Sequence, residues 1–154
     1  MTAHAHPLAA RTTRRLWLLV LVEVVVAVNA VGGAVYGLAG AEDVPREWLE
    51  GTPFDSYFVP SLILLLAIGG GMGAAATAFL IKHRRAPELS IVAGLVLTGW
   101  IAVQVLMIAP NGGVSWLQPA MLVAGALVAT LGWQLREANA STDPQLQHRP
   151  RGRR

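Results

Sequence analysis

Residues 16–38 read LWLLVLVEVVVAVNAVGGAVYGL, an apolar run in which only Glu23 and Asn29 are strongly polar. A helix rises about 1.5 Å per residue, so roughly 20 residues cross the ~30 Å hydrocarbon core of a bilayer. The run is apolar on every side of such a helix, unlike a surface helix of a soluble bundle. This stretch therefore predicts a membrane-spanning helix.

Three further apolar stretches have similar length: Val59–Ile81, Leu89–Ile108 and Leu117–Leu135. Of the 154 residues, 54% are hydrophobic and 14% are charged, against about 25% charged in soluble domains. Irregular backbone cannot face lipid, which means that all four stretches must be helical. The sequence predicts an all-α fold, a four-transmembrane-helix bundle with antiparallel up-down order.

Positive charge marks one side of the predicted bundle, and short loops rich in lysine and arginine stay in the cytoplasm. The basic residues on this side are Arg11, Arg14, Arg15, Lys82, Arg84, Arg85, Arg136, Arg149, Arg151, Arg153 and Arg154. The other side carries Arg46 with Glu42, Asp43, Glu47, Glu50 and Asp55. We therefore predict a multi-pass protein of a bacterial inner (plasma) membrane with both termini in the cytoplasm.

The chain divides into a basic cytoplasmic N-terminus (1–15), the transmembrane domain (16–136) and a disordered basic tail (137–154) whose arginines could touch anionic lipid. One alternative concerns the first span. Ala39-Gly40-Ala41 fits a small-residue cleavage site, which would make residues 16–38 a signal peptide. The apolar run is much longer than a signal peptide needs, and it keeps Glu23, so we expect a retained helix.

The sequence lacks the residues that several kinds of catalytic and metal site require. There is no cysteine, which excludes disulfides, thiolate metal sites and thiol nucleophiles. His4, His6 and His148 lie in the tails, and His83 sits in a basic turn that repels cations. No hydrolase, metalloprotease or phosphate-loop motif occurs. We expect no metal, no cofactor and no nucleic-acid partner; an enzyme is not expected.

The two loops opposite the basic side share a phrase. Trp48-Leu49-Glu50 precedes Pro53 in the first, and Trp116-Leu117-Gln118 precedes Pro119 in the second. Pro45–Glu50 is predicted to form one short helix. Aromatic rings are favoured at headgroup depth, so both tryptophans are interpreted as interfacial anchors. The alternative is an outward-facing pocket for a lipid or other hydrophobic ligand, lined by Trp48 and Trp116.

Glu23 lies about 10 Å inside the predicted hydrocarbon core. A bare carboxylate there is costly, and burial disfavours the charged form, which is the property that a proton-coupled site uses. Other polar residues of the spans are candidates for the same proton or ligand site: Asn29, Thr77, Thr98, Gln104 and Thr130. Thr77 and Thr130 fall in the layer of Glu23. The set is either a polar path or, as we expect for Asn29, Thr98 and Gln104, a group of interhelical hydrogen bonds.

Small residues four positions apart allow close helix packing. Gly33 and Gly37 form such a pair in the first span, and Gly69 and Gly73 in the second. Packing within the bundle is the expected use, and homodimerisation or a flexible point in the second span are the alternatives.

Two resemblances bear on function. The phrases WLEGTPFDSYFVP (48–60), GWIAVQV (99–105) and SWLQP (115–119) resemble small uncharacterised four-helix membrane proteins of actinobacteria and related bacteria. This resemblance implies the architecture and no activity. Leu21-Val22-Glu23-Val24 is weakly similar to the first helix of small multidrug resistance transporters, in which Glu23 would exchange a proton for a cationic drug. The long first loop and the missing motifs depart from that family.

Three functions remain open. The first is a non-enzymatic accessory or interaction protein in contact with membrane lipid, with a homodimer or a larger membrane complex as candidate assemblies. The second is a small proton-coupled transporter that uses Glu23. The third is a lipid- or quinone-binding protein with its site at the Trp48 and Trp116 loops.

Overall fold

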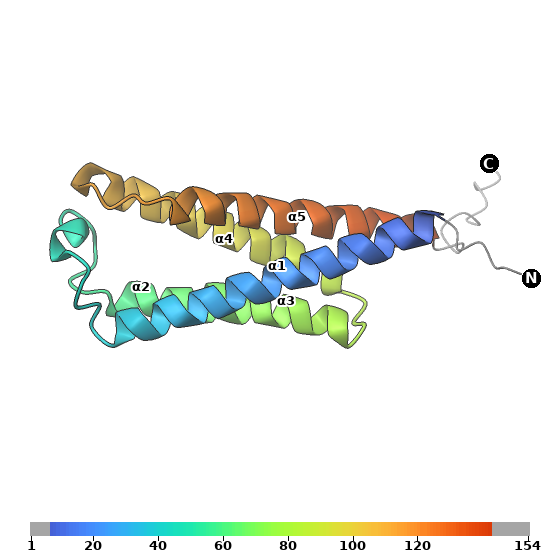
Figure 1. The fold of residues 1–154 in the computed structure, drawn as a ribbon, viewed down its shortest axis with the longest axis horizontal. Coiled ribbons are helices and arrows are strands. Elements are labelled where there is room, and N and C mark those ends of the chain that lie inside the picture. Colours follow the sequence, from blue (N-terminus) through green and yellow to red (C-terminus); the bar gives the residue numbers. More distant parts are fainter. Residues whose placement is uncertain (1–6, 143–154) are drawn as a thin grey trace, which may run out of the picture.

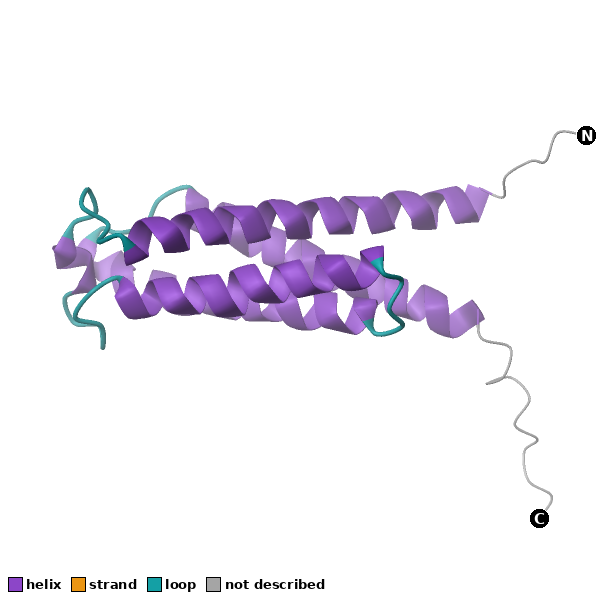
Figure 2. Cartoon of the chain, turned by 90° about the horizontal axis from the view of Figure 1, so that it is seen from below, coloured by secondary structure: helices purple, strands orange, loops and turns teal. Residues whose placement is uncertain are grey.

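The computed structural model describes residues 7–142, which are all-helical and contain no strand (Figures 1 and 2). Four helices in this range are long and apolar enough to cross a membrane. The elements are α1 (Pro7–Leu38), η1 (Arg46–Leu49), α2 (Phe58–Ile63), the π-helical η2 (Leu64–Gly70), α3 (Gly71–Leu80), α4 (Ala86–Ile108), η3 (Ala109–Asn111) and α5 (Leu117–Thr142).

The helix ends differ from the predicted spans at both ends of the chain. Helix α1 begins at Pro7, well before Leu16, and α5 continues to Thr142. The prediction of a disordered tail from residue 137 is therefore wrong for residues 137–142, because a helix that satisfies its own backbone hydrogen bonds can continue beyond an apolar span. Residues 143–154 lie outside the described range. The short helix predicted at Pro45–Glu50 is the single 3₁₀ turn η1.

The second span is one continuous rod of α2, η2 and α3. Helix α1 packs beside this rod and beside α5, and α4 packs beside α3 and α5. Helices α1 and α4 therefore face each other across the centre of the bundle. The side chains that fill this centre come from all four spans, and the largest fully buried ones include Leu19, Ile68, Met72, Leu97 and Val128.

Large apolar side chains also cover the outside of the bundle. Leu66 is 69% exposed, Leu106 is 77% exposed and Val123 is 68% exposed, each within one of the four spans. Soluble monomers rarely expose apolar patches larger than a few hundred Å². The surface formed by such side chains is suited to contact with lipid.

Glycines bring two pairs of helices into close contact. Gly37 of α1 lies directly against Ser61 of α2, and Gly69 of η2 lies against Val31 and Ala30 of α1. Gly33 lies against Leu64, whereas a Cβ added at Gly73 would meet nothing within 4 Å.

The closest approach to the backbone of a neighbouring helix joins α4 and α5. A Cβ added at Gly94 would lie 2.6 Å from the backbone nitrogen of Ala129 and 2.6 Å from the carbonyl oxygen of Gly125. Gly94 faces two small residues of α5, Gly125 and Ala129, which lie one helical turn apart. The two helices can therefore pack backbone to backbone only because Gly94 has no side chain.

The bundle is narrow at one end and wider at the other. In Figure 1, α1 begins beside the last turns of α5 and crosses to lie beside α2, while α4 and α5 remain paired. One helical hairpin consists of α1 and the rod of α2, η2 and α3, and the other consists of α4 and α5. The two hairpins diverge towards the end that carries loop 40–57 and loop 109–116. We call this end the loop end. The Lys82–Arg85 turn lies at the opposite end.

Candidate functional site

Hydrogen bonds tie the two loops of the loop end to each other. The side-chain amide of Asn111 donates to the carbonyl oxygen of Glu50 at 2.8 Å and to that of Trp48 at 3.5 Å. Gly112 has a φ of 72°, a left-handed conformation that glycine adopts without strain, and the chain reverses there. The Trp48 ring packs on Gly113, where an added Cβ would lie 3.0 Å from it. Asn111 and Gly113 thereby hold Trp48 between the loops.

Loop 40–57 is also closed upon itself. The Tyr57 hydroxyl donates to the carbonyl oxygen of Pro45 at 2.6 Å, and the Thr52 hydroxyl donates to that of Leu49 at 2.8 Å. Burial raises the pKa of the Tyr57 phenol above its usual value, and the negative charge of Glu47 raises it further. The phenol therefore remains a hydrogen-bond donor at neutral pH.

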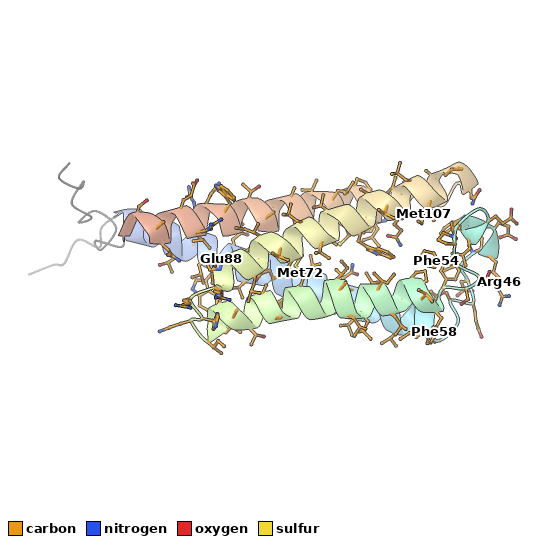
Figure 3. The ribbon with its side chains drawn as sticks, turned by 180° about the vertical axis from the view of Figure 1, so that it is seen from behind. Arg46, Phe54, Phe58, Met72, Glu88 and Met107 are labelled. Atoms are coloured by element: carbon orange, nitrogen blue, oxygen red, sulfur yellow. The ribbon has the colours of Figure 1, made fainter. Side chains whose placement is uncertain are left out.

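Beneath the loops lies a cavity of about 170 Å³, which we call the outer cavity. Loop 40–57 covers it with Trp48, Phe54 and Tyr57, and α4 forms its inner wall. Phe54 and Met107 both lie at this end of the bundle, and Glu88 lies at the other (Figure 3). The remaining lining residues are Val44, Leu49, Thr52, Pro60, Trp100, Val103, Gln104, Ile108, Gly113 and Gln118.

A second cavity of about 150 Å³, the inner cavity, lies deeper between the four spans. Gln104 and Gln118 line both cavities, so the two are adjacent. The wall of the inner cavity is mostly aliphatic and includes two residues of the π-helical segment. The lining residues besides the two glutamines are Val26, Asn29, Ala30, Gly33, Leu64, Ile68, Leu97, Ile101, Leu117 and Met121.

Two polar groups in these walls lack partners within the described part of the chain. The Trp100 indole Nε1 is buried and has no acceptor. The Gln104 side chain makes no hydrogen bond, whereas the Gln118 oxygen accepts two hydrogen bonds from Ser115, each 2.8 Å long. A buried polar group without a partner costs about 1–3 kcal/mol. Trp100 and Gln104 lie four residues apart on α4, one turn from each other; the Trp100 Nε1 is enclosed, whereas the Gln104 amide is open to a ligand in either cavity.

Glu23 lies elsewhere, in the centre of the bundle. The residue is fully buried, and its Oε1 accepts a hydrogen bond from the Ser90 hydroxyl. Its Oε2 is buried and has no partner among the described residues. Because Glu23 belongs to α1 and Ser90 to α4, the bond joins the two helices that face each other across the bundle. Glu23 lines neither the outer nor the inner cavity.

None of the other polar candidates forms a hydrogen bond with Glu23 in the described residues. Thr77, Thr98 and Thr130 each donate to the carbonyl oxygen four residues earlier in their own helix, at 2.7, 2.8 and 2.7 Å. Asn29 lines the inner cavity, and its amide contacts the Met121 sulfur at 3.9 Å. The structure thus brings Asn29 and Gln104 to one cavity wall, and it leaves Thr77 and Thr130 on the exposed surface.

The two loop tryptophans have different surroundings despite the shared phrase. Trp48 is half-buried over the outer cavity, whereas Trp116 is 79% exposed and lines none of the cavities given above. Ser90, Trp100, Asn111, Gly113 and Gln118 were not among the residues singled out from the sequence as site candidates. For Trp100 and Gln118, the signal was present in the GWIAVQV and SWLQP phrases.

Within residues 7–142, no cluster of three or more His, Asp or Glu side chains that could hold a metal ion occurs. His4, His6 and His148 lie outside that range. No family model, curated protein or solved structure matches the chain. The resemblances drawn from the sequence therefore stay predictions, and the site rests on its own geometry.

Proposed function

We propose that this chain is a multi-pass membrane protein that binds a lipid-like molecule in the outer and inner cavities. The single observation that carries the proposal is a mostly apolar cavity lined by Gln104, whose side-chain amide makes no hydrogen bond within the described residues. Ligand sites are typically apolar clefts with a few polar groups that fix orientation. A bound molecule with a polar head would supply a hydrogen-bond partner for the Gln104 amide.

Binding is favoured over catalysis because the linings of the two cavities contain no carboxylate, histidine, lysine or arginine. General acid–base chemistry and nucleophile activation most often use such groups, and the phenol of Tyr57 in the outer lining already donates to Pro45. A ligand-binding accessory subunit is one form of the non-enzymatic protein expected from the sequence.

The orientation is part of the proposal. The exposed side chains of Arg14, Arg15, Lys82, Arg84 and Arg85 favour a cytoplasmic position for the end opposite the loops. The outer cavity would then open towards the outer leaflet of a bacterial inner membrane. A ligand could enter from the membrane at the depth of its own headgroup.

The test compares two tryptophans of the same loops. The wild type, Trp48→Ala and Trp116→Ala are purified in mild detergent, and organic extracts are analysed by mass spectrometry. We expect one class of lipid-soluble molecule to copurify with the wild type and with Trp116→Ala, and its amount to fall several-fold in Trp48→Ala. Equal amounts in all three, or none in any, would contradict the proposal.

A second candidate function, proton-coupled transport, is favoured by Glu23. It is a fully buried ionisable side chain with one oxygen unpartnered, and buried acidic groups in membrane spans are commonly functional. Glu23→Gln reconstituted in liposomes should then lose substrate-driven proton movement while it retains normal insertion. If the wild type moves no protons with any tested cationic substrate, this function is excluded.

A further inference from the structure

The outer and inner cavities differ in chemistry, and the difference narrows the class of ligand. Four aromatic rings surround the outer cavity: Trp48, Phe54, Tyr57 and Trp100. Aliphatic side chains such as Val26, Leu97 and Ile101 dominate the inner cavity. A molecule that fills both therefore has a head suited to aromatic contact and a flexible apolar tail.

Neither lining contains a charged side chain. A phosphate or an ammonium group placed there would lose its hydration without gaining a counter-ion, which is strongly unfavourable. The outer cavity is therefore suited to an uncharged head. Phospholipids and cationic amphiphiles fit it poorly.

The polar groups of the wall specify what the head must offer. The Trp100 Nε1–H is a donor only, and the Gln104 amide can donate two hydrogen bonds and accept others. The NH₂ group of Gln104 can donate to a carbonyl oxygen on the ligand, and an N–H donor such as that of Trp100 beside the cavity also favours an acceptor over a donor on the head. A flat ring would also stack on the aromatic side chains, an arrangement that is favourable when rings are offset or edge to face.

We propose that the ligand is a quinone-class molecule: an uncharged six-membered ring with carbonyl oxygens in the outer cavity and an isoprenoid or alkyl tail in the inner cavity. An engineered apolar cavity of ~150 Å³ in another protein holds benzene, so an outer cavity of about 170 Å³ is large enough for one such ring. The shared wall at Gln104 and Gln118 is where the ring would join the tail. This inference rests on the proposed function and adds the chemical class of the ligand.

The experiment titrates the detergent-purified full chain with three probes, measured by calorimetry. Decylubiquinone has the ring and the tail, geranylgeraniol has a tail without the ring, and dioleoylphosphatidylglycerol has a charged head. Gln104→Leu removes the free amide with little change in volume. Gln134→Leu is the matched control, because Gln134 lies on α5 away from both cavities.

We expect decylubiquinone to bind the wild type and Gln134→Leu alike, and at least tenfold more weakly to Gln104→Leu, with the other two probes binding more weakly throughout. If geranylgeraniol or the phosphatidylglycerol binds best and depends on Gln104, the quinone class is wrong while the cavity remains a ligand site. If no probe binds, or if Gln104→Leu changes nothing, both the class and the proposed function fail.

Discussion

The hydrogen bond from Ser90 to Glu23 gives the most quantitative prediction. In Ser90→Ala the fully buried Glu23 carboxyl loses its one partner among the described residues. A buried acceptor left unsatisfied costs about 1–3 kcal/mol, and interhelical hydrogen bonds in membranes average ~0.6 with a maximum near 1.7 kcal/mol. We therefore expect Ser90→Ala to lower the free energy of unfolding by about 1–2 kcal/mol.

Almost all of the stability lost in Ser90→Ala should come from the unsatisfied carboxyl of Glu23. The Ser90 hydroxyl has a second acceptor, the carbonyl oxygen of Ala86 at 3.3 Å, whereas neither oxygen of Glu23 has another partner in the described chain. In a Glu23→Leu background, Ser90→Ala should therefore cost less than about 0.5 kcal/mol. The double-mutant cycle would then give a coupling of roughly 1 kcal/mol.

The measurement is reversible unfolding in mixed micelles, with Thr77→Ala as the control. The Thr77 hydroxyl donates to the carbonyl oxygen of Gly73 in its own helix and is exposed, so its removal should change stability by less than about 0.5 kcal/mol. If Ser90→Ala costs the same with and without Glu23, the bond across the bundle contributes nothing and the reasoning is refuted.

Three further predictions concern packing, the loop and orientation. Gly94→Ala should destabilise the protein by about 1–3 kcal/mol in the same unfolding assay, because its Cβ would lie 2.6 Å from the backbone of α5, while Gly73→Ala should be nearly neutral. Tyr57→Phe should loosen loop 40–57, because it removes the hydrogen bond from the Tyr57 hydroxyl to Pro45. Burial raises the pKa of this phenol, so the bond should stabilise the wild type fully below pH 10 and lose its effect only as the pH rises above that value. A pH series of unfolding curves measures this dependence. The chain has no cysteine, so Asp55→Cys and Arg84→Cys can be labelled singly; an impermeant maleimide should reach only Asp55→Cys in intact cells, and labelling of Arg84→Cys would reverse the proposed orientation.

The four spans could be predicted because hydropathy is a property of consecutive residues. Their apolar runs exceed the thickness of a bilayer, and only helices satisfy the backbone there. The ends were less predictable, since residues 137–142 extend α5 without adding to the apolar run. The π-helical segment Leu64–Gly70 had no distinct pattern beyond the glycines Gly69 and Gly70 at its end.

The partner of Glu23 could not be predicted from depth alone. A span that is apolar on all sides has no hydrophobic periodicity from which its rotation about the helix axis can be read. Helix α1 also crosses the bundle at an angle, so equal residue counts from the span ends do not place side chains at equal depth. Counting residues from the span ends suggested Thr77 and Thr130. The contact is made by Ser90, which stands one residue after the predicted start of the third span.

The outer cavity could also be predicted only in part, because its shape depends on contacts between residues that are far apart in the sequence. Trp48 was a candidate because aromatic residues in loops are often anchors or binding residues, and the same argument applied to Trp116. The difference between them arises from Asn111 and Gly113, which position Trp48 across the interface of two loops. Contacts between residues more than 60 positions apart are not readable from a single sequence.

Native mass spectrometry of the chain released from detergent tests the central claim most directly. The wild type should retain one uncharged lipid-soluble molecule per chain, and Gln104→Leu should lose it while Gln134→Leu keeps it. A wild-type chain that is released bare under conditions that preserve weakly bound lipids would show that the cavities at the loop end hold no ligand. Retention of the same adduct by Gln104→Leu would show that Gln104 does not hold it.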